Sequence, residues 1–182
     1  GFGLVKVFSN LINPPFGWDC LNYHFTFPVE WLKNKNLLNP MVINCDPSPP
    51  YYPITGSLIF LWLILPLKSV FLADLGQAPF FILCFISAFS IAQKIGIAKD
   101  YSYFAAALFV LIPNFFKQLE IAYVDTIFCA FFLISVNFLL ALSLEFNLRN
   151  LLLSAISLGL VFGTKTIAIP FGAVLIVFFV II

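Results

Sequence analysis

Charged side chains are scarce in this chain of 182 residues: Asp, Glu, Lys and Arg make up 9%, against roughly 25% in an average soluble domain. The net charge is +1 and there is no basic run. Nothing in the sequence would therefore hold a phosphate backbone, and no nucleic-acid partner is predicted. His24 is the only histidine, and no Cys–His spacing accompanies it, so the sequence argues against a zinc site.

Apolar and aromatic side chains dominate instead. Hydrophobic residues make up 62% of the chain and aromatic residues 18%, with 24 Phe among them. A soluble core of this size could not hide them, so the composition predicts an integral, multi-pass membrane protein with an all-α, polytopic transmembrane helix bundle. The chain starts at Gly1, has its only methionine at Met41 and ends within an apolar run. We therefore expect a piece of a longer protein, incomplete at both ends.

The sequence divides into two regions. Residues 1–53 are polar and rich in Pro and Asn, and we expect an extracytoplasmic loop with short interfacial helices. One such helix is predicted over 28–33, with proline in its first turn and Trp31 as an anchor at the interface. The transmembrane helical region is residues 54–182, and its apolar stretches are 54–67, 77–93, 101–117, 124–144, 151–164 and 167–182.

The length of each stretch predicts which ones cross the membrane. A crossing takes about 20 apolar residues, so the proline-bracketed stretch 54–67 is predicted to be re-entrant or a short surface helix, and the others to give about five spans. The lysines of the 94–100 loop predict a cytoplasmic location for it. If 54–67 does not cross, Asp19, Asp125 and Lys165 share the outer face. If it crosses, Asp19 lies on the opposite side from the other two.

Polar residues beside the membrane are candidates for chemistry, because an ionisable group at a bilayer face is costly to keep. Asp19 could act as a general base that takes a proton from an acceptor hydroxyl or amine. The structural alternative is a solvated loop aspartate or a helix N-cap. His24 could orient a phosphate or a carboxylate, or serve as a structural donor. Tyr23 and Tyr52 could stack on a sugar and close over it.

Two further charged residues lie at the ends of apolar stretches. Asp125 opens the stretch 124–144, where it could cap the helix and gain from its dipole. Alternatively, Asp125 and Glu120 could bind a metal or position the acceptor. Lys165 sits in a break between two apolar stretches, where it could snorkel to the interface or neutralise a lipid-linked phosphate as a point charge.

Glycine spacing and cysteines give weaker signals. Gly159 and Gly163 form a GxxxG spacing, which lets helices approach closely. The two cysteines of the apolar stretches are expected to be packing residues. Cys20 and Cys45, in the first loop, could pair if the loop faces an oxidising space, although two cysteines do not establish a bridge.

The order of these motifs resembles that of one family. The motifs are Asp-x-x-x-Tyr-His from Asp19, Trp31-Leu32, Tyr52-Pro53, Tyr-x-Asp ending at Asp125, and Gly-x-x-x-Gly-Thr-Lys ending at Lys165. They look like the integral-membrane GT-C glycosyltransferases of the protein mannosyltransferase and aminoarabinose transferase type, the dolichyl-phosphate-mannose branch. The resemblance covers roughly residues 17–170 and makes the chain an N-terminal-half fragment. It rests on order and spacing, because each motif is short.

The resemblance implies an enzyme that transfers a sugar, with inversion, from a polyprenyl-phosphate carrier to an extracytoplasmic acceptor. It implies Asp19 as the catalytic base and Asp125 as a secondary site residue. Phosphate binding by Lys165 and sugar stacking by Tyr23 and Tyr52 are our inferences from the residues themselves. The expected partners are membrane lipid, the polyprenyl-phosphate-linked sugar as donor substrate, and a protein, lipid or polysaccharide acceptor.

The same resemblance implies a location in the plasma (inner) membrane or the endoplasmic reticulum, with the active site extracytoplasmic. No cofactor is certain, and the need for a divalent metal stays open. Two features depart from the family: Trp18 and Cys20 flank Asp19 where many relatives have a second acidic residue, and Arg149, the only arginine, is on the predicted cytoplasmic side. The competing classes are a polytopic transporter, which also uses proline-interrupted helices, and a non-catalytic membrane subunit.

Overall fold

The computed structural model describes residues 2–38, 40 and 46–181, and over these residues the regular structure is entirely helical. The α-helices are α1 (Phe2–Ile12), α2 (Thr26–Asn34), α3 (Thr55–Ile64), α4 (Ala78–Lys94), α5 (Lys99–Val110), α6 (Pro113–Lys117), α7 (Asp125–Leu144), α8 (Leu148–Thr164) and α9 (Ala168–Ile181). Shorter elements join them: a π-helical turn at Cys20–His24 and 3-10 segments at Pro49–Tyr51, Val70–Leu75 and Gln118–Glu120.

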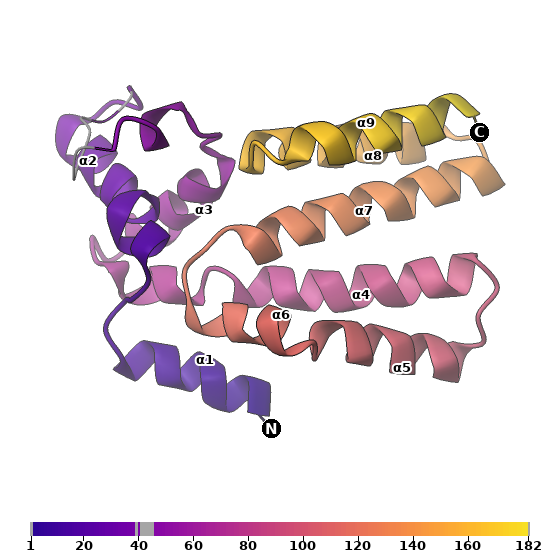
Figure 1. Ribbon diagram of the computed structural model, residues 1–182, viewed down its shortest axis with the longest axis horizontal. Helices are drawn as coiled ribbons and strands as arrows, with labels where there is room; N and C mark the ends of the chain where they lie inside the picture. Colours follow the sequence, from indigo (N-terminus) through magenta and orange to yellow (C-terminus); the bar gives the residue numbers. More distant parts are fainter. Residues whose placement is uncertain (1, 39, 41–45, 182) are drawn as a thin grey trace.

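The helices form two groups. The long helices α4, α5, α7, α8 and α9 lie side by side with their axes roughly parallel (Figure 1). Helix α7 packs against α4 and α8, and α5 packs on α4. The π-helical turn, α2 and α3 gather at one end of these long helices and are called the cap below (residues 17–38 and 46–64). The cap and the ends of the long helices enclose the site described below.

Helix length bears directly on the predicted membrane passes. Among the described residues, Val70–Lys94 and Asp125–Leu144 are long and apolar enough to cross a membrane. A third crossing results if the bent pair α5 and α6 counts as one span. Helices α3, α8 and α9 are apolar but shorter. The structure therefore supports two or three candidate spans, and the predicted five remain a prediction.

The predicted stretch 101–117 is broken in the structure. Helix α5 ends at Val110, and α6 starts at Pro113 with the chain bent by 63° between the two helices. Proline has no backbone N–H to donate and disfavours helical dihedrals in the residue before it. Ile112 accordingly has φ −51° and ψ 125°, outside the helical region. The stretch 101–117 therefore forms two helices with a bend at Pro113, and its crossing as one span remains a prediction.

A buried apolar core joins the cap to α7. Phe25 and Phe60 of the cap meet edge to face, and Ile127 of α7 is buried in the same cluster. Cys20 is fully buried there as well. Burial of each such side chain contributes about 1.5–3 kcal/mol, so this core fixes the cap on the end of α7. The predicted pairing of Cys20 involves Cys45, which lies outside the described residues.

Trp31 corrects one prediction about the cap. Helix α2 forms as expected around Pro28, but the Trp31 ring is only 4% exposed and its Nε1 donates to the carbonyl oxygen of Leu38 at 3.0 Å. Trp31 is therefore a core residue and not an interface anchor. Exposed indoles of the kind that anchor at an interface belong to Trp18 and Trp62.

A buried glutamine braces the entrance to α7. Gln77 precedes α4 and is 1% exposed. Its Nε2 donates to the Gln118 carbonyl oxygen at 2.7 Å and also to that of Ile121, and its Oε1 accepts from the Thr126 amide at 3.1 Å. The bond from Thr126 satisfies an amide that the N-terminus of α7 leaves without an intrahelical partner, and the other two tie α4 to the segment before α7. They fix the position at which Asp125 starts α7.

The two glycines of the GxxxG spacing differ in the structure, and this gives a first testable prediction. A Cβ on Gly163 would lie 2.4 Å from Oγ1 of Thr55, where α8 meets α3, whereas a Cβ on Gly159 would meet nothing within 4 Å. Gly163→Ala is therefore expected to destabilise the fold by about 1–3 kcal/mol through overpacking. Gly159→Ala, the matched control on the same helix, should be neutral or stabilising by about 0.5–1 kcal/mol.

Thermal unfolding of the two variants in the same detergent tests the difference. Equal melting temperatures would mean that α3 does not pack on Gly163.

Candidate functional site

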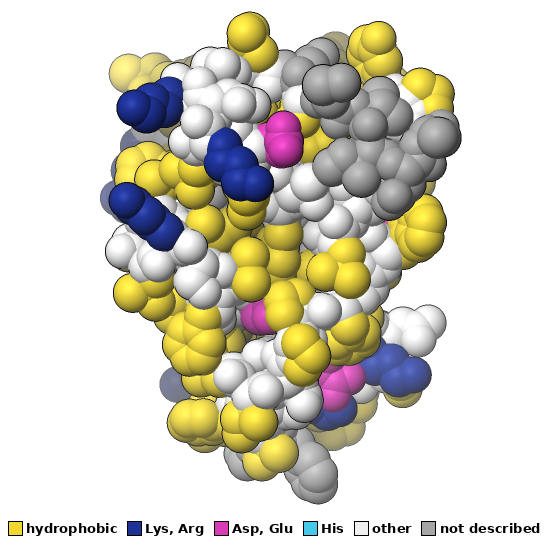
Figure 2. Space-filling model, turned by 90° about the vertical axis from the view of Figure 1, so that its left-hand side faces the viewer, with side chains coloured by type: hydrophobic (Ala, Val, Ile, Leu, Met, Phe, Trp, Pro, Cys, Tyr) yellow, Lys and Arg dark blue, Asp and Glu magenta, His cyan; other side chains and the backbone are white. Residues whose placement is uncertain are grey.

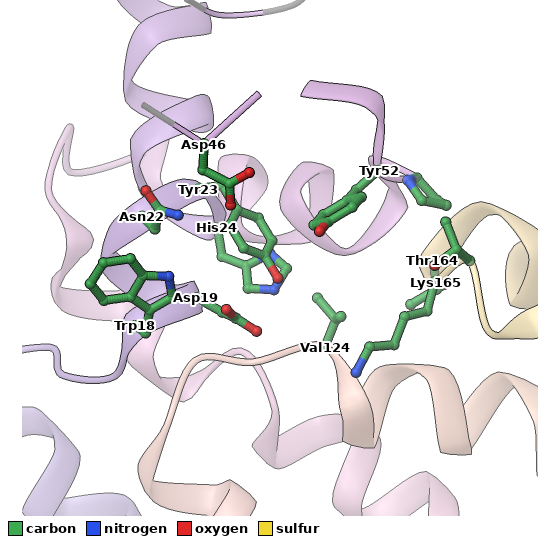
Figure 3. A pocket seen from close by; sticks show the side chains of 12 residues that line it. Trp18, Asp19, Asn22, Tyr23, His24, Asp46, Tyr52, Val124, Thr164 and Lys165 are labelled. Atoms are coloured by element: carbon green, nitrogen blue, oxygen red, sulfur yellow. The ribbon is translucent and has the colours of Figure 1, made fainter. Parts of the chain in front are cut away.

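A cavity of ≈ 280 Å³ lies where the cap meets the ends of α7 and α8. The cap supplies most of its wall, and the link between α8 and α9 closes the opposite side (Figure 3). Its lining residues are Trp18, Asp19, Asn22, Tyr23, His24, Asp46, Tyr52, Pro53, Val124, Thr164, Lys165 and Thr166. The lining combines aromatic rings with carboxylate, imidazole and ammonium groups that could orient a ligand.

Asp19 enters the cavity from the start of the π-helical turn. Gly17 turns the chain there with φ +99°, and a Cβ at this position would lie 3.0 Å from the Tyr123 hydroxyl, so glycine suits both the conformation and the space. The Asp19 side chain makes no capping hydrogen bond, and the Leu21 amide donates to the Gly17 carbonyl at 3.1 Å instead. The N-cap alternative for Asp19 is therefore wrong, and its carboxylate points into the cavity (Figure 3).

Tyr23 and Tyr52 form an aromatic wall beside Asp19. Their rings meet edge to face with centroids 5.6 Å apart. Burial, followed by the charge of Asp19 and a hydrogen bond to its carboxylate, raises the pKa of Tyr23 above its ordinary range. Tyr23 therefore keeps its proton at neutral pH and acts as a donor. Tyr52 is 40% exposed at the cavity mouth, where its ring is accessible to a ligand.

His24 lies deep in the cavity wall and is 4% exposed. Its Nδ1 is 3.3 Å from Oγ of Ser57 on α3. Burial, and secondarily the charge of Lys165, lower the pKa of His24 to about 3. The imidazole is neutral near pH 7, so it can orient a ligand as a hydrogen-bonding group but brings no positive charge to a phosphate. His24 can therefore orient a ligand or serve as a structural donor, but only as a neutral group.

Lys165 supplies the positive charge of the cavity. It follows the end of α8 in extended conformation, and its Nζ lies 2.6 Å from Oδ1 of Asp125 at the first turn of α7. The N-cap position of α7 is Val124, and Asp125 lies in the first turn of the helix, where its negative charge interacts favourably with the helix dipole. The ion pair holds the ammonium group over the cavity opposite Asp19 (Figure 3).

Glu120 does not join Asp125. It forms an ion pair with Lys6 of α1, while Asn10 of the same helix donates to the Leu119 carbonyl oxygen. Within the described part of the chain, no three carboxylate, histidine or cysteine side chains lie close enough together to hold a metal ion. The metal-binding alternative for Asp125 with Glu120 is therefore not supported by the geometry.

Asp46 is a site residue that the sequence reasoning missed. It lines the cavity from the segment before Pro47, and its Oδ1 accepts from the Ser48 amide at 3.0 Å. Figure 3 shows its carboxylate directed into the space that Asp19 also faces. No motif marked Asp46 in the sequence, because it reaches the cavity only through the folding of the Pro-rich segment over α3.

The structure brings the six predicted site residues to one place. Five line the cavity, namely Asp19, Tyr23, His24, Tyr52 and Lys165, and Asp125 is joined to them through its ion pair. Asp19 and Lys165 therefore lie at the same end of the long helices, which is the arrangement expected if 54–67 does not cross. Their chemical roles remain predictions.

The buried, neutral His24 gives a prediction about pH. Its pKa is about 3 in the folded state and 6.5 in an exposed reference, so below pH 6.5 the unfolded state binds a proton that the folded state does not. The contribution of His24 to stability should fall as the pH falls, by about 1.6 kcal/mol between pH 6.5 and 5. His24→Gln should flatten this part of the profile, measured as melting temperature against pH. Identical slopes for the two proteins would show that another group is responsible.

Comparison of the chain with protein-family models, with curated proteins and with solved structures gives no match. The motifs and the cavity are therefore the basis for a functional proposal.

Proposed function

We propose that the chain is the N-terminal half of a membrane glycosyltransferase of the GT-C type, which moves a sugar from a polyprenyl-phosphate-sugar donor to an extracytoplasmic acceptor with inversion. One observation carries the proposal. A carboxylate, Asp19, and an ammonium group, Lys165, face each other across one cavity at the end of apolar helices. Inverting transfer to a hydroxyl or amine needs a base on the acceptor side and a positive charge at the departing phosphate.

The two charges divide the reaction between them. Asp19 would accept the proton of the acceptor as its oxygen or nitrogen attacks the anomeric carbon. The bond from that carbon to the phosphate oxygen breaks, and the phosphate leaves with the bonding electrons. Lys165 would stabilise the phosphate at this point, as a positioned ammonium group does for developing negative charge. A lipid phosphate is already ionised and can leave without being protonated. The reaction therefore needs a general base for the acceptor but no general acid for the leaving group.

The position of the cavity suits a donor anchored in lipid. The isoprenoid tail would lie in the bilayer and present the phosphate sugar at the membrane surface. The donor has then lost much of its translational and rotational entropy before it reaches the cavity. Tyr52 is exposed at the mouth, and Tyr23 lies behind it, so the two rings offer a face on which a sugar can stack. In this proposal the cap is extracytoplasmic and the long helices make about five passes.

The experiment that tests the proposal supplies the full-length protein that contains this chain, in vesicles, with a panel of polyprenyl-phosphate sugars and candidate acceptors. The measurement is the release of polyprenyl phosphate and the formation of a glycosylated product. Release that depends on both the protein and an acceptor supports transfer. Passage of sugar across the membrane without release of the carrier would favour a transporter. Neither result with any donor would favour a non-catalytic membrane subunit.

A further inference from the structure

A second hollow lies in the cap, separate from the cavity that contains Asp19. It has a volume of ≈ 330 Å³ and runs between α2 and the turn that follows α3. This volume is at the small end of the range for ligand pockets, which is roughly 300–1,000 Å³. Its lining residues, called the lysine groove below, are Val29, Leu32, Lys33, Ile64, Leu65 and Lys68.

The lysine groove combines two kinds of surface. Four of its lining residues are aliphatic, and the remaining two are the exposed lysines Lys33 and Lys68. Among the residues that the structure describes, neither lysine belongs to an ion pair. Lys35 adds a third positive charge nearby, just after α2. Figure 2, which faces the cap end of the molecule, shows basic side chains gathered beside apolar ones on one side of this face.

The backbone gives a second, independent observation. Among the described residues, the only two non-glycine residues with positive φ are Lys35, at φ 53°, and Lys68, at φ 49°. This left-handed conformation is disfavoured for residues with a Cβ, and glycine or asparagine would adopt it more readily. The chain has lysine at both positions, which places backbone strain and unpaired positive charge together. Such strain is concentrated at sites that bind ligands.

The surroundings indicate what kind of anion fits. Leu65 and Leu67 precede Lys68 and are exposed, and Trp62 on the last turn of α3 is 73% exposed. A free phosphate would leave this apolar surface in water. A lipid with a phosphate headgroup would cover the apolar surface with its chains and pair its negative charge with the ammonium groups.

We propose that the lysine groove binds an anionic phospholipid, with its phosphate between Lys33 and Lys68 and the first part of an acyl chain against Leu32 and Leu65. The lipid would attach the cap to the surface of the bilayer and so hold the cap beside the membrane. This site is distinct from the cavity and does not depend on the proposed transfer reaction.

The test is lipid binding by the detergent-purified chain, measured by native mass spectrometry during titration with phosphatidylglycerol. Phosphatidylcholine with the same acyl chains is the zwitterionic probe, and glycerol 3-phosphate is the soluble one. Phosphatidylglycerol is expected to bind about tenfold more tightly than phosphatidylcholine, because the choline cation of phosphatidylcholine neutralises the headgroup and is repelled by the two groove lysines. Glycerol 3-phosphate should not displace it at equal concentration.

The lysines provide a matched pair of variants. Lys68→Gly removes a groove lysine and relieves a left-handed residue, so the affinity for phosphatidylglycerol should fall about tenfold while the melting temperature is unchanged or higher. Lys35→Gly removes the same charge and the same strain outside the groove, and its affinity should change less than about threefold, as for a screened surface charge. Lys33→Ala should resemble Lys68→Gly. Leu65→Ser, which removes an apolar contact but no charge, should lower the affinity for phospholipid without changing the affinity for glycerol 3-phosphate.

Three outcomes would overturn the proposal. Equal losses in Lys68→Gly and Lys35→Gly would show attraction to the general surface charge only. Equal binding of the two phospholipids would show that the groove does not select an anionic headgroup. Displacement by glycerol 3-phosphate at equal concentration would show a site for a soluble phosphate.

Discussion

Replacing Asp19 by asparagine is expected to lower the rate of sugar transfer by roughly 10²–10⁴-fold, the usual contribution of a general base. The amide has nearly the same shape as the carboxylate but cannot accept the proton of the acceptor. Since the Asp19 side chain makes no capping hydrogen bond, the fold should tolerate the change. The measurements are the transfer rate in vesicles and the melting temperature, and we expect a large loss in the first with little change in the second.

Asp46→Asn is the matched control for this variant. Asp46 is a carboxylate in the same cavity, so its amide removes the same charge from the same enclosed space. One of its oxygens accepts from the Ser48 amide, and the amide oxygen of asparagine can keep that bond. We expect less than a tenfold loss from Asp46→Asn. Equal losses from the two variants would assign the effect to the charge of the cavity and not to a base at Asp19.

The helices of the bundle could be predicted closely because their apolar stretches are long and their ends carry local signals. Helix α7, predicted at 124–144, forms over Asp125–Leu144, and the stretch 77–93 forms as α4 over Ala78–Lys94. The bend within 101–117 occurs at Pro113, where proline is a local signal for the end of a helix. The number of crossings could not be read from composition alone, because short apolar helices such as α3 are compatible with several positions relative to lipid.

The site was predictable where residues carried a motif and was missed where only tertiary packing places them. The motif residues Asp19 and Lys165 are far apart in the chain but line one cavity. Asp46 belongs to no motif and was overlooked. The charge state of His24 could not be predicted either, because the sequence does not show whether this histidine is exposed or buried against Ser57. Trp31 was assigned to the interface by residue type, although its side chain is buried and its indole donates to a backbone carbonyl.

The second large effect is expected at Lys165. Its ion pair with Asp125 has side chains 36% and 44% exposed, and a pair this exposed contributes only about 0–1 kcal/mol to stability. The ion pair therefore positions the ammonium group over the cavity but contributes little to the free energy of unfolding. Because His24 is neutral, Lys165 is the positive charge among the cavity-lining residues that the structure describes. Lys165→Met should weaken donor binding about 10–100-fold, the range for one charge-assisted hydrogen bond.

A charge-swapped variant separates this role from a structural one. In Lys165→Asp with Asp125→Lys, the opposite charges can still pair across the same two positions, so the melting temperature should stay within a few degrees of the parent. The ammonium group, however, then starts from α7 and a carboxylate from the α8–α9 link, so the phosphate loses its partner and meets a negative charge. Transfer should remain as low as in Lys165→Met, while Lys165→Arg should keep most of it. Recovery of transfer in the swapped variant would mean that the ion pair serves the fold alone and that the donor phosphate is bound elsewhere.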